Sequence, residues 1–131
     1  MKVPFVDLKK QYLTLKMEID EAISRVLAES AFVGGSFVES FEKAFAKFCN
    51  TEHCVGVGNG TDALFLVLKA LNVGNGDEVI TGANTFIATS EAITRTGAKV
   101  VFVDVDPETY NMDVKKIEKA VSYTHLRAHE T

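Results

Sequence analysis

The stretch Val55 to Leu64 (VGVGNGTDAL) constrains the fold more than any other part of the sequence. It predicts a short apolar strand, a glycine-rich turn and the first turn of a helix that continues to Leu71. Such a turn presents free backbone N–H groups at the positive end of a helix dipole, where anions and above all phosphates bind. We therefore expect a phosphate site on Gly60, Thr61 and Asp62.

From His53 onward the sequence alternates between strand and helix patterns. The expected strands are His53–Gly58, Glu78–Thr81 and Lys99–Val103, and the expected helices are Thr61–Leu71, Thr85–Thr96 and a last one that Asp113 caps and that reaches Val121. This alternation predicts parallel strands joined by right-handed crossovers. The strands are short and continuously apolar, as expected when both faces of a sheet are covered. The fold class is therefore α/β with a mostly parallel sheet.

Two helices are expected before the first strand. Apolar residues recur at intervals of three and four from Lys9 to Glu29, behind a possible cap at Asp7, and a break follows from Ser30 to Gly35. Ser36 is expected to cap the second helix, with Glu39 completing a capping box and phenylalanines along one face. These helices cannot be a crossover, so they pack on another face of the sheet, another domain or a second subunit.

Composition narrows the class of protein. The chain has 131 residues, enough for one domain, and its 47% hydrophobic content is typical of a globular protein. A net charge of −4 argues against nucleic acid as the main partner. No apolar run approaches the ~18–20 residues of a membrane helix, and the start lacks a signal-peptide core. We expect a cytoplasmic location and no membrane partner.

A dinucleotide is one possible owner of the phosphate. The run Gly58 to Ala63 fits the loose G-x-G-x-x-A form of a dinucleotide fingerprint. That interpretation also needs an acid at the carboxyl end of the second strand, where the ribose would lie. Asp77 and Glu78 instead precede this strand. A dinucleotide such as NAD is therefore the second choice.

Phe86 suggests a different ligand. It follows the second strand, and ligands of parallel sheets bind beyond the carboxyl ends of adjacent strands. Its ring could stack on a flat heterocycle whose phosphate sits on the turn at Gly60. A flat heterocycle with one short phosphate arm describes pyridoxal phosphate better than a dinucleotide. The alternative is that Phe86 is a core residue at a helix start.

Several motifs, in this order, resemble the N-terminal part of the DegT/DnrJ/EryC1/StrS family of pyridoxal-phosphate-dependent sugar aminotransferases. They span residues 3–113: VPFVDL at the start, FVGG at 32–35 followed by Phe41-Glu42, VGNGTDAL at 57–64, GDEVI at 76–80, NTFIAT at 84–89 and VFVDVD at 101–106. Each motif is modest, but the ordered set is specific.

The resemblance implies a partial large domain of the fold-type I aminotransferase architecture, in a protein that works as a homodimer. It implies transfer of an amino group, commonly from glutamate, to a nucleotide-linked keto sugar. By position, Gly60, Thr61 and Asp62 would cradle the phosphate, chiefly through backbone N–H groups, and Phe86 would stack on the pyridine ring. The loop holding Phe32, Gly34 and Gly35 would lie near the substrate mouth.

The chemistry also needs a lysine amine and an acid on the pyridine nitrogen, which in the family lie downstream of residue 131. We therefore expect no catalytic residue in this chain and no transaminase activity from it alone. Residues 1–52 would carry the N-terminal helices, residues 53–121 the alternating strands and helices, and residues 122–131 a non-native or disordered tail. An NAD-dependent sugar-modifying enzyme and a non-catalytic pyridoxal-phosphate-binding regulator or structural subunit stay open as alternatives.

Overall fold

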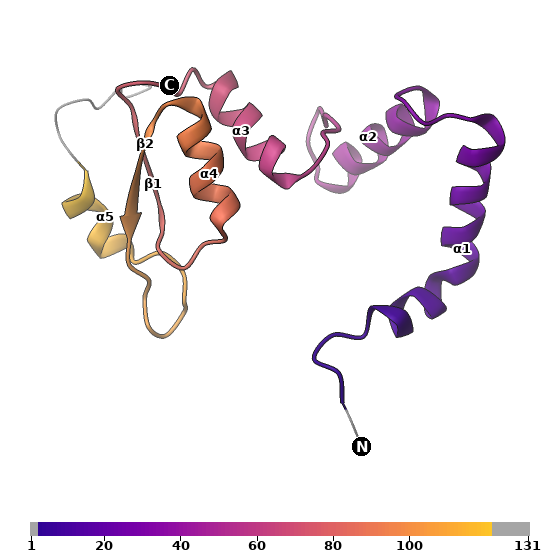
Figure 1. Ribbon diagram of the computed structural model, residues 1–131, viewed down its shortest axis with the longest axis horizontal. Helices are drawn as coiled ribbons and strands as arrows, with labels where there is room; N and C mark the ends of the chain where they lie inside the picture. Colours follow the sequence, from indigo (N-terminus) through magenta and orange to yellow (C-terminus); the bar gives the residue numbers. More distant parts are fainter. Residues whose placement is uncertain (1–2, 122–131) are drawn as a thin grey trace. The chain divides into compact units, whose positions relative to one another are not determined.

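The computed structural model describes residues 3–121 (Figure 1). The expected tail at 122–131, with His125 and His129, lies outside these residues. The chain divides into two compact units, one up to Gly56 and one from Val57 on. The first holds the helices α1 (Leu8–Glu29) and α2 (Ser36–Phe48). The second holds α3 (Gly60–Ala70), β1 (Glu78–Gly82), α4 (Ile87–Thr96), β2 (Lys99–Val103) and α5 (Val114–Ala120).

The two helices of the first unit form where the apolar spacing predicts them. The Asp7 side chain caps α1 by accepting a hydrogen bond from the N–H of Lys10 at 2.9 Å, which confirms the expected cap. The expected cap at Ser36 is wrong. Gly35 is the N-cap of α2, with φ 79°, and no side chain caps the helix. Because Ser36 is already helical, its hydroxyl does not act as the cap of the first turn.

The apolar faces of these helices stay largely open within the first unit. The rings of Phe41, Phe45 and Phe48 follow one another along α2, with centroids 5.5 and 6.2 Å apart. All three rings are exposed, and Ala46 is the one fully buried hydrophobic residue in this unit's described part. The predicted aromatic face therefore exists, but the described residues of the first unit do not cover it.

The second unit is built on a parallel pair of strands. β1 and β2 pair in the register Glu78↔Lys99 to Gly82↔Val103, and α4 connects them as a crossover helix (Figure 1). The core lies between α4 and the strands and contains Ala92, Ile93, Ala98 and Val103. α4 ends at Gly97, whose φ of 92° is the left-handed conformation that stops a helix. The parallel α/β prediction is confirmed for this part of the chain.

The expected strand His53–Gly58 is wrong. This segment has no strand assignment, and among the described residues the sheet consists of β1 and β2 alone. A strand exists only where a neighbour completes its hydrogen-bond ladder, and residues 3–121 offer this segment none. The N–H of Gly56 instead donates to Glu42 Oε1 at 2.6 Å.

The remaining differences are small. α3 begins at Gly60 rather than Thr61, and α4 begins at Ile87 rather than Thr85. Asp113 caps α5 as expected, accepting a hydrogen bond from the N–H of Lys115 at 3.0 Å. In residues 3–121, no helix has the length and apolar character needed to cross a bilayer.

Candidate functional site: the amide end of helix α3

The start of α3 has the features of an anion site. Asn59 is the N-cap, and its Oδ1 accepts a hydrogen bond from the N–H of Asp62 at 2.9 Å, while its carbonyl accepts one from Ala63 at 3.1 Å. No hydrogen bond within residues 3–121 occupies the N–H groups of Gly60 and Thr61. Two backbone donors therefore remain available at the positive end of the helix dipole.

The space around this turn fits a phosphate. A Cβ atom placed on Gly60 would meet nothing within 4 Å, so an anion can approach the backbone there. A Cβ atom on Gly58 would lie 3.2 Å from Asp62 Oδ2, a close approach that favours glycine at this position. An open amide end fits the close backbone contact that a phosphate group needs.

The Asp62 carboxylate is held by two neighbours. Its Oδ2 accepts a hydrogen bond from Asn59 Nδ2 at 2.9 Å, and its Oδ1 lies 3.5 Å from Arg95 Nη1 in the last turn of α4. The Arg95 guanidinium lies over the Phe65 ring, 4.4 Å from its centroid. Sequence reasoning missed both partners. An asparagine directly before a helix is a recognisable cap signal, whereas Arg95 approaches Asp62 only through the packing of α4 on α3.

Phe86 follows the strand β1, as the sequence predicts. It is the N-cap of α4, four residues after β1 ends, and its side chain is 76% exposed. An exposed ring is free to stack on a heterocycle. No hydrogen bond or ring contact in the described part of the chain joins Phe86 to the first turn of α3. Its role as a stacking residue stays a prediction.

The predicted substrate loop belongs to the first compact unit. Phe32, Gly34 and Gly35 connect α1 to α2, and both glycines have positive φ, 61° and 79°. Phe32 is exposed and lines a shallow apolar pocket on α1 with Ala22, Ile23, Val26 and Leu27. The loop's predicted position near the substrate stays a prediction.

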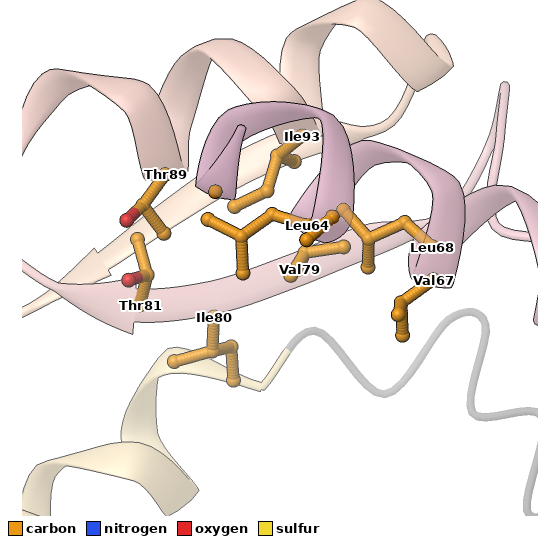
Figure 2. A pocket seen from close by; sticks show the side chains of 10 residues that line it. Leu64, Val67, Leu68, Val79, Ile80, Thr81, Thr89 and Ile93 are labelled. Atoms are coloured by element: carbon orange, nitrogen blue, oxygen red, sulfur yellow. The ribbon is translucent and has the colours of Figure 1, made fainter. Parts of the chain in front are cut away.

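A cavity of about 310 Å³ lies between α3, β1 and α4 and reaches Gly60 at the start of α3 (Figure 2). Its lining is almost entirely apolar: Gly60, Ala63, Leu64, Val67, Leu68, Val79, Ile80, Thr81, Thr89 and Ile93. Figure 2 shows Thr81 and Thr89 together at one end and Val67 and Leu68 at the other. A phosphate dianion would be poorly solvated in such a cavity. We therefore place the candidate anion site at the amide end of α3 and not inside the cavity.

The acids that a dinucleotide would need lie at the wrong end of the strand. Glu78 is the first residue of β1, and Asp77 precedes it. Asp77 Oδ2 accepts a hydrogen bond from the N–H of Gly74 at 2.8 Å, and Lys99 Nζ lies 2.6 Å from Glu78 Oε1. Both carboxylates therefore take part in contacts at the amino end of the sheet, which fits a structural role.

A hydrogen-bonded loop follows β2 at the carboxyl edge of the sheet. The N–H groups of Thr109 and Glu108 donate to Asp106 Oδ1, each at 2.9 Å, and these bonds hold the pKa of Asp106 below its usual range. Asn84, just after β1, donates to the Tyr110 carbonyl at 3.1 Å. The segment that leads to Phe86 is thus tied to this loop.

Solved structures identify the fold to which the parallel β1–α4–β2 unit belongs. The chain has part of the fold of pyridoxal-phosphate-dependent sugar aminotransferases. The pattern of the DegT/DnrJ/EryC1/StrS aminotransferase family matches residues 13–125. The chain belongs to this family, as its motifs indicate.

Three relatives show how close the likeness is. A "pleiotropic regulatory protein" from Geobacillus stearothermophilus is 47% identical over 93% of this chain and 33% of the relative. A dTDP-3-amino-3,6-dideoxy-alpha-D-galactopyranose transaminase from Aneurinibacillus thermoaerophilus is 42% identical, over 95% and 36%. DesV from S. venezuelae, solved with a ketimine intermediate, superimposes with a TM-score of 0.88 at 43% identity, over 93% and 33%. The chain thus spans about a third of the length of these relatives.

Proposed function

We propose that this chain is the N-terminal part of a pyridoxal-phosphate-dependent transaminase. The complete protein would move an amino group from glutamate, the donor that family members commonly use, to the keto group of a nucleotide-linked sugar. The observation that carries the proposal is the open amide end of α3 in a chain that belongs to a family of aminotransferases. We further propose that the complete protein is a homodimer in the cytoplasm.

The residues of this chain would bind and orient the cofactor. The free N–H groups of Gly60 and Thr61 donate to the phosphate, and Asp62 shapes the same turn with its carboxylate held aside. The Phe86 ring covers the pyridine face, and the loop at Phe32, Gly34 and Gly35 borders the substrate. Pyridoxal phosphate itself supplies the electron sink for amino transfer.

This chain supplies no catalytic residue in the proposal. Seven lysines of the described part are on exposed helix positions (Lys9, Lys10, Lys43, Lys47, Lys69, Lys115 and Lys119), and Lys16, Lys99 and Lys116 pair with Asp20, Glu78 and Asp104. Exposed lysines and lysines paired with a carboxylate lack the apolar surroundings that activate a lysine amine as a nucleophile. The reactive lysine and the acid on the pyridine nitrogen therefore come from the remaining two thirds of a protein of the relatives' length.

Borohydride trapping followed by peptide mapping tests which part of the complete protein supplies the reactive lysine. The complete protein, incubated with pyridoxal phosphate and reduced, should carry a pyridoxyl group on a lysine outside residues 3–121. It should also release 2-oxoglutarate from glutamate when a nucleotide-linked keto sugar is added. A stoichiometric pyridoxyl group on any lysine of residues 3–121 would contradict the proposal.

Gly60→Val tests the phosphate turn. The open space at Gly60 admits the side chain without a clash, but the branched group blocks an anion from the backbone. We expect pyridoxal phosphate binding to weaken by at least tenfold with little change in melting temperature. Ala70→Val, at the exposed far end of the same helix, is the matched control and should bind normally.

A regulatory role is the second candidate, because a relative 47% identical carries the name pleiotropic regulatory protein. A non-catalytic regulator would bind pyridoxal phosphate but release no 2-oxoglutarate in the same assay. The dinucleotide alternative has less support, since Asp77 and Glu78 lie at the amino end of β1. Titration with NADH, followed by its fluorescence, separates it from both.

A further inference from the structure

The Asp62 carboxylate presents a problem for the proposed phosphate site. It lies in the first turn of α3, where a negative charge suits the helix dipole but repels a phosphate dianion at the same amides. The structure places a cation on this carboxylate. Arg95 Nη1 lies 3.5 Å from Asp62 Oδ1, and Asn59 Nδ2 holds the other oxygen at 2.9 Å.

We infer that Arg95 is a positioning residue for the phosphate site: it neutralises Asp62 and keeps the carboxylate on the flank of α3, so that the amides of Gly60 and Thr61 face a phosphate. This inference deepens the proposed function and rests on it. Arg95 acts through Asp62 and is not itself assigned a contact with the cofactor.

The position of Arg95 is itself constrained. Its guanidinium lies over the Phe65 ring, 4.4 Å from the centroid, and this contact restricts the conformation of the Arg95 side chain. Phe65 is on α3, one turn after Asp62, so α3 provides both the ring that supports the guanidinium and the carboxylate that it pairs with. Asn59 meanwhile caps the helix with Oδ1 and holds Asp62 with Nδ2, so one side chain fixes the backbone turn and the carboxylate together.

Exposure argues against a purely structural purpose for the pair. The side chains of Arg95 and Asp62 are 46% and 39% exposed, and solvent-exposed ion pairs contribute little to folding stability. The electrostatic effect on a nearby dianion is larger than the effect on folding, because the dianion carries twice the charge of a single carboxylate.

The test compares two probes, pyridoxal phosphate and pyridoxal, which differ by the phosphate. Their dissociation constants are measured by calorimetry on the complete protein at low salt. Arg95→Gln should weaken pyridoxal phosphate about tenfold and leave pyridoxal unchanged, and added salt should shrink the difference. Lys69→Gln is the matched control, because it removes one exposed positive charge from the other end of α3 and should change neither constant.

A second variant keeps the inference falsifiable. In Asp62→Asn combined with Arg95→Gln, no carboxylate remains to be neutralised, so binding of pyridoxal phosphate should return to within about threefold of wild type. Equal weakening of both probes by Arg95→Gln, an unchanged ratio, or no recovery in the double variant would overturn the inference. If the wild-type protein does not prefer pyridoxal phosphate over pyridoxal, the proposed function itself fails.

Discussion

The two compact units of this chain bury very different shares of their apolar residues. In the first, Met17 and Phe48 are each 86% exposed, and in the described part only Ala46 is a buried hydrophobic residue. In the second, Ala92, Ile93 and Val103 are between 0% and 3% exposed. The first unit has two well-formed helices without a core, whereas the second has a small core with few strands.

This difference shows that forming a helix and burying it are separate steps. α1 and α2 need only caps and residue spacing, which are local properties of the sequence. Burial in the second unit requires β1 and β2 to pair although α4 separates them in the sequence. The two strands and the helix then enclose the same side chains. The exposed faces of α1 and α2 are where the proposed second subunit, or more of the same protein, would pack.

Truncation of an apolar side chain should show the difference between the two units most clearly. Ile93, 2% exposed, is the largest fully buried side chain described, and Ile93→Ala should lower the free energy of unfolding by about 2–4 kcal/mol. The matched change Ile23→Ala on α1, at a side chain 53% exposed, should cost less than about 0.5 kcal/mol. Urea denaturation followed by circular dichroism measures both. Equal effects would mean that the first unit has a hidden core.

Two glycines with positive φ offer a finer comparison. Gly97 has φ 92°, and a Cβ there would lie 2.3 Å from Asn75 Oδ1, so Gly97→Ala should destabilise the second unit by about 2–3 kcal/mol. Gly34 has φ 61° with nothing within 4 Å, so Gly34→Ala carries the backbone strain alone, about 1 kcal/mol. Thermal melts of both variants give the difference. A larger loss from Gly34→Ala would show that the α1–α2 connection is packed against something.

Acid titration of single carboxylates should change stability less than the core and glycine substitutions do. The pKa of Asp106 in the second unit is lowered by hydrogen bonds from the backbone of Thr109 and Glu108, and that of Asp20 in the first by a hydrogen bond from Lys16. A lowered pKa means stabilisation that is present above the unfolded value of about 3.9 and is lost as pH falls through the folded value. Below about pH 4, the protection of the Thr109 amide against hydrogen exchange, relative to its intrinsic rate at the same pH, should therefore decrease.

Asp106→Asn is the control for this titration. The amide oxygen still accepts the backbone hydrogen bonds but does not titrate, so the pH-dependent loss of protection at Thr109 should disappear. Loss of protection at the same pH in this variant would assign the transition to another group.

Much of the fold is predictable from the sequence because its signals are local. The caps at Asp7 and Asp113, the stop at Gly97 and the parallel β1–α4–β2 unit all follow from short motifs and spacing. The segment 53–58 is different, since its apolar residues favour a strand but only a partner can make it one. Ser36 shows the limit of motif reading, because the backbone conformation of Gly35 moved the cap by one residue.

The candidate site also contains one part that the sequence predicts and one part that it does not. The turn at Gly60 could be found from its glycines and the helix that follows, and the ordered motifs identified the family. Arg95 could not be found, because nothing in the sequence links it to Asp62 until α4 packs on α3. Sequence reasoning therefore found the glycine turn that we propose binds the phosphate, but not the side chain that we infer positions Asp62 beside it.

The unpaired segment 53–58 bears on the order in which the protein assembles. β1, α4 and β2 join residues only about twenty positions apart, so they can associate as soon as they are synthesised. The segment before them has no strand partner among residues 3–121. The segment that leads directly into the proposed phosphate turn would then be among the last parts to order, and the proposed cofactor site would form late in folding.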